Sequence, residues 1–550
     1  MKTNRIPELD AVRGIAISTV PGNLRRRPLV ALAFLVLFVA AAYEAADYVL
    51  AGNMTGLAYI AMAVVLCGLV ISILNDWRKG LYLFIAWLLF EDLARKYLGN
   101  NMAIYFAKDF LLMVVYISFL AAYRRKKVSG FRPPFLIPLL LFVWFGVAQI
   151  FNPGSTHIMY GLLGFKVYFY YMPLLVVGYA LVNSEAELRR FFFVNLALAS
   201  IIAVLGIAQA ILGHTFLNPP RLADDIRELS TLYRAAPISG LTFYRPNSVF
   251  VSTGRFGNFI LLTWLLVFGF AGYLLLRHKR GRAFVFWVLG LTAAALVLGS
   301  SRGVVMWGSG SALVGALAFV WGAPWRQREV IRVLRTLQRA FLGVVLAMAL
   351  LLLFFPDALL SRMAFYTETL SPTSSASELQ NRTWDYPIRN FLGAFGSDRW
   401  PYGYGIGTSS LGVQYVARFF NAKPSPVIVE SGFGMLVVEM GIGGLLLWLV
   451  MSFAIVLSAW RVVKKLRGSP WFPIAFMIFW YSGLLLIPIT YAGMAPYQDF
   501  VMNAYLWLLL GILFRLPTLA VSAQFAAAQA ELPMQQASPQ SLNLYQPRMP

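Results

Sequence analysis

The sequence contains few of the residues that usually bind metals or form disulfides. Its 550 residues include one cysteine and three histidines. Cys67 lies within an apolar run, so the chain cannot form an intramolecular disulfide or a cysteine-based metal cluster. His157, His214 and His278 are far apart in the sequence, which argues against a histidine-rich metal site. We therefore expect no metal.

Charged residues are also scarce. They make up 13% of the chain, whereas hydrophobic residues make up 59%, more than a soluble core could bury. This composition predicts an all-α, polytopic membrane protein. No cleavable signal peptide is expected, because residues 1–27 are basic and contain Pro7 and Pro21 before the first long apolar stretch.

Apolar stretches of about 20 residues, the length that crosses a bilayer as a helix, recur along the chain. Because two of them are short or rich in glycine, we expect 12 to 14 transmembrane helices. The expected spans lie near residues 28–51, 57–75, 81–98, 103–122, 135–151, 158–182, 191–212, 256–276, 283–299, 303–322, 340–356, 432–459, 471–490 and 497–514.

Acidic residues are the rarer charge, with 23 of them against 46 lysines and arginines. The basic residues cluster in alternate connections, as in Arg124–Lys127 and Arg461–Arg467. This alternation predicts cytoplasmic positions for these clusters and for both termini. The orientation of the chain then explains the net charge of +23, and we expect no nucleic-acid partner.

This topology divides the chain into five segments. They are a cytoplasmic segment 1–27, a helix bundle 28–356 with an outer loop at 213–255, a large outer loop 357–431, carboxyl-terminal helices 432–514, and a disordered cytoplasmic tail 515–550 rich in Ala, Gln, Pro and Ser. Long connections on one face indicate an enzyme or receptor site there. The absence of a visible inverted repeat weakens a transporter interpretation.

Arginines on the outer side are candidates for binding a diphosphate, because a guanidinium forms paired hydrogen bonds and stays charged. The strongest candidates are Arg245, Arg302 and Arg382, and the hypothesis requires all three to converge on one pocket. Arg255 and Arg389 are weaker candidates. The alternative for each is an arginine that reaches lipid headgroups.

Lys166 lies within an apolar, aromatic span, where a charged group predicts a functional role. The alternative is a buried ion pair with an acid such as Asp109 or Glu439. Lys108 and Asp109 are expected to form local ion pairs.

Glu430 and Glu439 are the candidate catalytic acids of the outer region. On a continuous helix they would lie on opposite sides and about 13 Å apart, too far for a glycosidase pair. Glu430 is the better candidate for a general base, with a carboxylate at a helix start as the alternative. Glu439 is expected to have a structural partner.

Three alternating glycines, Gly403, Gly405 and Gly407, follow Pro401. We expect them to let the backbone approach a bulky ligand, with Trp384 and Tyr404 among the aromatic faces on which sugars could stack.

Several motifs together resemble those of the O-antigen ligase and polymerase family. The sequence from Asn381 to Trp384, the sequence from Pro401 to Gly407 and the segment Glu430 to Gly444 resemble its large periplasmic loop, and Ser300–Gly303 and Tyr244–Phe250 resemble its two arginine segments. The resemblance implies a GT-C-like, metal-independent glycosyltransferase without a cofactor, in the bacterial cytoplasmic membrane. Its expected partners are an undecaprenyl-diphosphate-linked glycan donor, a glycan acceptor, membrane lipids and a chain-length regulator.

Glu430 stands where the ligases of that family have a histidine, which favours a polymerase of O-antigen or exopolysaccharide repeats. A ligase that transfers a lipid-linked glycan to a lipid or protein acceptor, and a flippase for lipid-linked oligosaccharides, are the alternatives. Residues 6–17 resemble the start of sugar-acetylating membrane acyltransferases, but no histidine follows in 18–27, and we transfer no function from this likeness.

Overall fold

The computed structural model describes residues 54–99, 101–220, 222, 227–228, 231–277, 280–324, 338, 349 and 352–536. The chain divides into two units, Met1–Asn75 and Asp76–Pro550. In the first unit the described element is an apolar helix, α2 (Met54–Asn75). The expected segment 1–27 and the expected span 28–51 lie outside the described residues.

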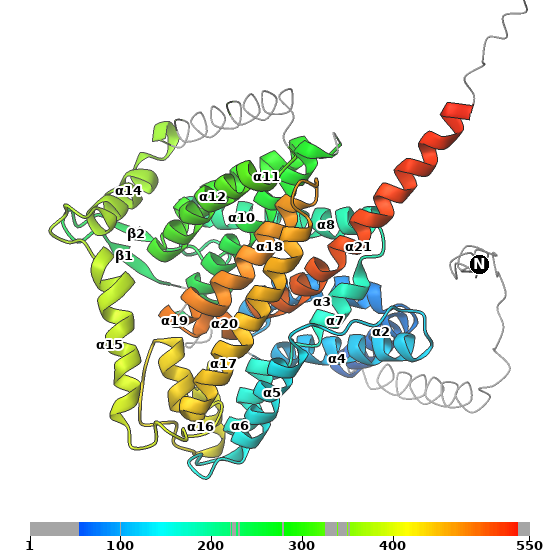
Figure 1. Ribbon diagram of the computed structural model, residues 1–550. Helices are drawn as coiled ribbons and strands as arrows, with labels where there is room; N and C mark the ends of the chain where they lie inside the picture. The colour runs from blue at the N-terminus through cyan, green and yellow to red at the C-terminus, as the bar shows by residue number, and fades with distance from the viewer. Residues whose placement is uncertain are drawn as a thin grey trace, which may run out of the picture. The chain divides into compact units, whose positions relative to one another are not determined.

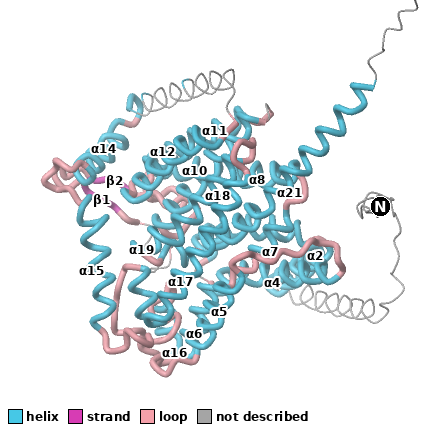
Figure 2. Tube along the Cα trace, viewed as in Figure 1, coloured by secondary structure: helices cyan, strands magenta, loops and turns pink. Residues whose placement is uncertain are grey.

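The second unit is predominantly helical (Figures 1 and 2). Its helices before the first outer segment are α3 (Trp77–Leu98), α4 (Met102–Arg124), α5 (Leu136–Ile150), α6 (Ile158–Phe169), α7 (Leu174–Leu181) and α8 (Glu185–Leu212). Those that follow are α10 (Thr253–Leu276), α11 (Arg282–Leu298), α12 (Arg302–Gly322), α17 (Gly432–Lys465), α18 (Phe472–Leu484), α19 (Thr490–Ala492), α20 (Ala495–Gln498) and α21 (Phe500–Gln536).

Among the described residues, eight helical segments are long and apolar enough to cross a membrane. They indicate a multi-pass membrane protein. Three shorter apolar helices correspond to further expected spans. The expected span 81–98 coincides with α3, which does not meet the criterion because charged residues such as Glu91 and Lys96 interrupt it. The expected span near 340–356 falls mostly outside the described residues.

The centre of this bundle is α10, which packs against α11, α12 and α18. Close helix contacts elsewhere depend on small residues. A Cβ on Gly178 of α7 would lie 2.2 Å from the Leu508 carbonyl oxygen of α21, and one on Gly511 would lie 2.1 Å from that of Leu175. Small residues allow such backbone approach where apolar burial alone cannot drive helices together.

The segments expected on the outer side, 213–255 and 357–431, are together called the outer region, and they are more structured than the expected loops. The strands β1 (Tyr233–Ala235) and β2 (Thr242–Tyr244) form an antiparallel hairpin, and Phe243 packs against Phe365 of α14 (Pro356–Leu370). The segment 357–431 also contains a π-helical turn η2 (Asn381–Asp385), α15 (Tyr386–Gly393), a 3₁₀ turn η3 (Ala394–Gly396) and α16 (Val413–Phe420). Figure 1 shows β1, β2, α14 and α15 together on one side of the bundle.

The expected boundary between the last span and the tail differs from the structure. Helix α21 continues to Gln536, so residues 515–536 are helical and not a disordered tail. Alanine, glutamine and glutamate are strong helix formers, and they extend a helix that is already nucleated in the bundle. Residues 537–550 lie outside the described part of the chain.

Candidate functional site

A cavity of about 680 Å³ lies between α12, the end of α18 and the outer region. We call it the arginine cavity, because its charged lining residues are Arg234, Arg245, Arg302, Arg382 and one acid, Glu378. The three arginines expected to converge are therefore all present, although they come from distant parts of the chain. Arg245 follows β2, Arg302 begins α12 and Arg382 lies in η2.

Arg234 also lines the cavity, and sequence reasoning missed it. It reaches the cavity because β1 pairs with β2, which places Arg234 opposite Phe243. Its guanidinium lies 5.8 Å from the ring centre of Phe365, and that of Arg302 lies 5.2 Å from the same ring. A three-residue strand leaves little pattern in a sequence, so only its pairing could have revealed this arginine.

Glu378 binds two of these arginines. Its Oε1 lies 2.7 Å from Nη1 of Arg302, and its Oε2 lies 3.2 Å from Nε of Arg382. The hydrogen bond from Arg302 is the largest influence on the carboxyl group and lowers its pKa, with Arg382 acting in the same direction. Glu378 is the one carboxylate among the described lining residues, so the lining has an excess of positive charge.

Arg245 has no such carboxylate. Its Nε is buried and has no hydrogen-bond partner among the described residues. Burial lowers the pKa of its guanidinium to about 10, and the nearby charges of Arg234 and Arg302 contribute to the shift. A buried cation without a counter-ion is unfavourable, and an anionic ligand in the cavity would remove that cost.

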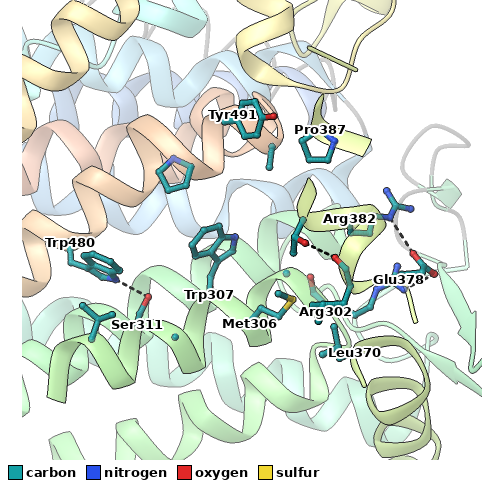
Figure 3. A pocket seen from close by; sticks show the side chains of 18 of the residues that line it. Arg302, Met306, Trp307, Ser311, Leu370, Glu378, Arg382, Pro387, Trp480 and Tyr491 are labelled. Atoms are coloured by element: carbon teal, nitrogen blue, oxygen red, sulfur yellow. Dashed lines mark hydrogen bonds and ion pairs between the residues drawn. The ribbon is translucent and has the colours of Figure 1, made fainter. Parts of the chain in front are cut away.

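The other end of the cavity is apolar. Figure 3 shows Trp480 and Ser311 at this end, away from Arg302 and Glu378. The indole Nε1 of Trp480 donates a 2.9 Å hydrogen bond to Ser311 Oγ, so the aromatic wall has its polar atom satisfied. Further lining residues here are Met306, Trp307, Val314 and Pro488. The cavity thus suits an amphipathic ligand that is anionic at one end.

Unusual backbone occurs at three places in or next to the cavity lining. The π-helical turn η2 contains Arg382, and a second one, η4 (Leu485–Ile489), contains the lining residue Pro488. Ser300, directly before the lining residue Ser301, has a φ of 56°. Such turns and left-handed residues occur frequently at functional sites, where their backbone conformation directs a side chain toward the ligand.

Arg362 links the segments that carry two of the cavity arginines. It is fully buried on α14, and its guanidinium donates to the Tyr244 carbonyl oxygen at 2.8 Å and to Ser300 Oγ at 3.0 Å. It also donates to the carbonyl oxygens of Leu298, Ala210 and Ala358. Tyr244 precedes Arg245, and Ser300 lies two residues before Arg302, so Arg362 connects both to one helix. Sequence reasoning gave it no role.

No protein-family model matches this chain, and no curated protein is significantly similar to it. Evidence for the function therefore comes from the sequence motifs and from the geometry of the arginine cavity.

Lys166 lies at a different cavity, of about 540 Å³, formed by α4, α6 and α16. Its Nζ is 2.6 Å from Oδ2 of Asp109, which is one of the ion pairs considered as an alternative. The structure thus does not bring Lys166 to the arginine cavity. Lys108 pairs with Glu91 at 2.8 Å and not with Asp109, because α3 packs along α4 and supplies a closer acid.

Arg255 and Arg389 are also outside the arginine cavity. Arg255 forms ion pairs with Asp92 at 2.7 Å and with Asp499 at 3.8 Å, so it joins α10 to α3 and to the residue between α20 and α21. Arg389 lies on α15, where its Nη2 donates to Asn381 Oδ1 at 2.9 Å.

Glu430 and Trp384 are exposed and do not line the arginine cavity. Glu430 lies two residues before Gly432, which begins α17, and its N–H donates to Asn390 Oδ1 at 3.2 Å. A hydrogen bond with Glu430 raises the pKa of Tyr386, whose ring lies 5.0 Å from the guanidinium of Arg382. Tyr386 thus links the expected base to Arg382, and Ser431, which follows Glu430, donates to the carbonyl oxygen of the lining residue Tyr491 at 2.8 Å.

Tyr404 and the alternating glycines do not line the arginine cavity, and this segment contacts α17. The N–H groups of Tyr404 and Gly405 donate to the carbonyl oxygens of Val438 and Glu439 at 2.8 and 2.9 Å. Tyr404 Oη bonds to Ser397 Oγ at 2.8 Å. Gly403 lets this segment lie against the kink at Gly441 in α17, where φ is 69°, and Gly407 lets it approach the Tyr160 carbonyl oxygen of α6. Glu439 is buried there and accepts from Ser409 and Ser410, as its expected structural role requires.

In the described part of the chain, no group of three or more His, Cys, Asp or Glu residues is placed so that it could hold a metal ion.

Proposed function

We propose that this protein is a membrane glycosyltransferase that polymerises undecaprenyl-diphosphate-linked oligosaccharide repeats into O-antigen or exopolysaccharide. The observation that supports it is the arginine cavity, where guanidinium groups gather at one end and apolar side chains line the other. A polyprenyl diphosphate has the same division between an anionic head and an apolar chain. The motifs that carry Arg245, Arg302 and Arg382 are those that resemble the O-antigen ligase and polymerase family.

In the proposed reaction an acceptor hydroxyl attacks the anomeric carbon of the donor sugar. The new carbon–oxygen bond forms as the bond to the diphosphate oxygen breaks, and undecaprenyl diphosphate leaves with the electron pair. Negative charge grows on the diphosphate as it leaves, and guanidinium groups that are already in place stabilise that charge without reorganising. Arg245, Arg302 and Arg382 are the residues proposed for this role, and Arg234 joins them.

The proton of the acceptor hydroxyl must also be removed. Glu378 is close to the arginines, but its lowered pKa makes it a weak base. Glu430 is exposed and is not among the described residues that line the cavity. We therefore propose the electrostatic part of catalysis for the cavity and leave the base unassigned.

The proposal includes the topology expected from the sequence. It places 12 to 14 spans in the bacterial cytoplasmic membrane in a GT-C-like arrangement, with both termini in the cytoplasm and the arginine cavity on the periplasmic side. Long outer segments and basic connections on the opposite face support this orientation.

The experiment is an analysis of undecaprenyl-linked glycans in a strain that lacks the gene. A missing polymerase leaves single lipid-linked repeats, and the wild-type gene restores long chains. Accumulation of long lipid-linked chains would instead identify a ligase, and repeats held on the cytoplasmic leaflet would identify a flippase. Restoration by wild type but not by a double Arg245→Ala, Arg302→Ala variant, at equal protein level, would assign the activity to this cavity.

A further inference from the structure

Glu378 occupies the position that an anionic ligand would take between two arginines of the cavity. Each of its carboxylate oxygens contacts a different guanidinium, Arg302 at 2.7 Å and Arg382 at 3.2 Å. Its backbone is also held, because its N–H donates to the Thr369 carbonyl oxygen at 3.0 Å and its own carbonyl oxygen accepts from the Arg382 N–H at 2.9 Å. The carboxylate is therefore attached locally to the cavity wall.

The other two guanidinium groups are not neutralised in this way. No described carboxylate forms an ion pair with Arg234 or Arg245, and burial lowers the pKa of both groups. The charge of Arg302 further lowers the pKa of both groups, and the charge of Arg234 also lowers the pKa of Arg245. The cavity thus contains one protein anion for four guanidinium groups and has capacity for more negative charge.

A cationic cavity with an apolar extension faces a selectivity problem in a membrane. Phospholipids are far more abundant than any lipid-linked sugar, and they too combine a phosphate with apolar chains. A phosphodiester carries one negative charge, so its exchange for Glu378 replaces one carboxylate with one anion and gains little Coulomb energy. A lipid-linked diphosphate carries two charges on adjacent phosphorus atoms and can contact more of the guanidinium groups at once.

We propose that Glu378 is a specificity-determining residue, an internal counter-anion that a lipid diphosphate displaces and a singly charged phospholipid does not. Specificity of this kind arises because the carboxylate opposes the wrong ligand more than the right one. The inference rests on the proposed function, since it takes the polyprenyl diphosphate donor as the right ligand.

The test measures binding of two lipids to the purified full-length protein in detergent, with undecaprenyl diphosphate and phosphatidylglycerol as probes and native mass spectrometry as the readout. Wild type is expected to prefer the diphosphate. In Glu378→Gln the affinity for phosphatidylglycerol is expected to rise about tenfold, with a smaller change for the diphosphate, so that the preference falls. The matched control is Glu368→Gln on α14, a carboxylate that bonds to the Ile238 and Ser239 N–H groups and does not line the cavity.

Glu378→Asp protects the test against misfolding, because it retains the charge and is expected to retain the preference. Thermal unfolding identifies any variant that has lost its fold. A folded Glu378→Gln with the wild-type preference would overturn the inference and leave the proposed function standing. Wild type that binds both lipids equally well would overturn the proposed function itself.

Discussion

The Nη1 atom of Arg302 lies 2.7 Å from Oε1 of Glu378, although Arg302 begins α12 and Glu378 lies beyond α14. This contact joins the membrane bundle to the outer region at the cavity. It also explains how Arg302, which has no acid near it in the sequence, is stable at the end of an apolar helix.

Arg302→Lys keeps the charge but loses the planar pair of donors. We expect the affinity for undecaprenyl diphosphate to fall about tenfold, because a single ammonium cannot bind a phosphate and Glu378 in the same geometry. Binding to the purified protein and polymer yield in cells measure the effect. Arg389→Lys is the control, since Arg389 is exposed on α15 and outside the cavity; an equal loss in both variants would count against a special role for Arg302.

Gly310→Leu tests the apolar end of the cavity. Gly310 lines the cavity, and a Cβ built on it meets no atom within 4 Å. A leucine there should fit without strain and occupy the space of the lipid chain, so binding of undecaprenyl diphosphate should weaken while thermal stability stays within about 0.5 kcal/mol of wild type. Gly290→Leu on α11, also without a close neighbour, should leave binding unchanged.

Arg362→Met removes a buried guanidinium that donates to Tyr244 and Ser300. We expect a loss of about 2–4 kcal/mol of stability, because several buried acceptors lose their donor. Ligand binding should weaken as well, since the segments before Arg245 and Arg302 lose their common anchor. Thermal unfolding in detergent measures the first effect. Arg362→Lys should recover part of it, and equal stability of Met, Lys and wild-type proteins would refute the anchoring role.

Acid should reduce the stability of the wild-type protein more than that of Glu378→Gln, because the ionised Glu378 contributes stability that acid removes. Its pKa is lower in the folded protein than in the unfolded chain, so the ionised group stabilises the fold above its unfolded pKa of about 4.3. That stabilisation is lost as the pH falls from about 4.3 through the lower folded value. The difference in melting temperature between wild type and Glu378→Gln should therefore be constant from about pH 5 to 7 and shrink below pH 4.3. A difference that grows in acid would contradict this assignment.

Gly407→Ala should destabilise the outer region. Gly407 has a φ of 88°, and a Cβ there would lie 1.9 Å from the Tyr160 carbonyl oxygen. Backbone strain and this contact together should cost at least about 2 kcal/mol, measured by thermal unfolding. Gly396→Ala, which has an ordinary φ and no neighbour within 4 Å, should have almost no effect. If both variants have the melting temperature of wild type, the result would contradict the close contact of Gly407 with Tyr160.

The sequence motifs correctly indicated three arginines that lie together at one cavity. The segments around Arg245, Arg302 and Arg382 each combine an arginine with turn residues outside an apolar run, and the structure brings all three to one cavity. Lys166 lies at another cavity and pairs with Asp109, which was the alternative interpretation, and Glu430 does not line the arginine cavity. Glu378, Arg234 and Arg362 had no distinguishing pattern of their own.

The sequence by itself determined that this is a helical, multi-pass membrane protein and where most of its spans lie. Each span must satisfy its own backbone hydrogen bonds and present apolar side chains to lipid, so its position depends only on local composition. Only the tertiary structure decided which cations share a cavity, which carboxylate lies between them and which arginine holds their segments. Those relationships depend on strand pairing and helix packing between residues that are far apart in the chain, and no local pattern encodes them.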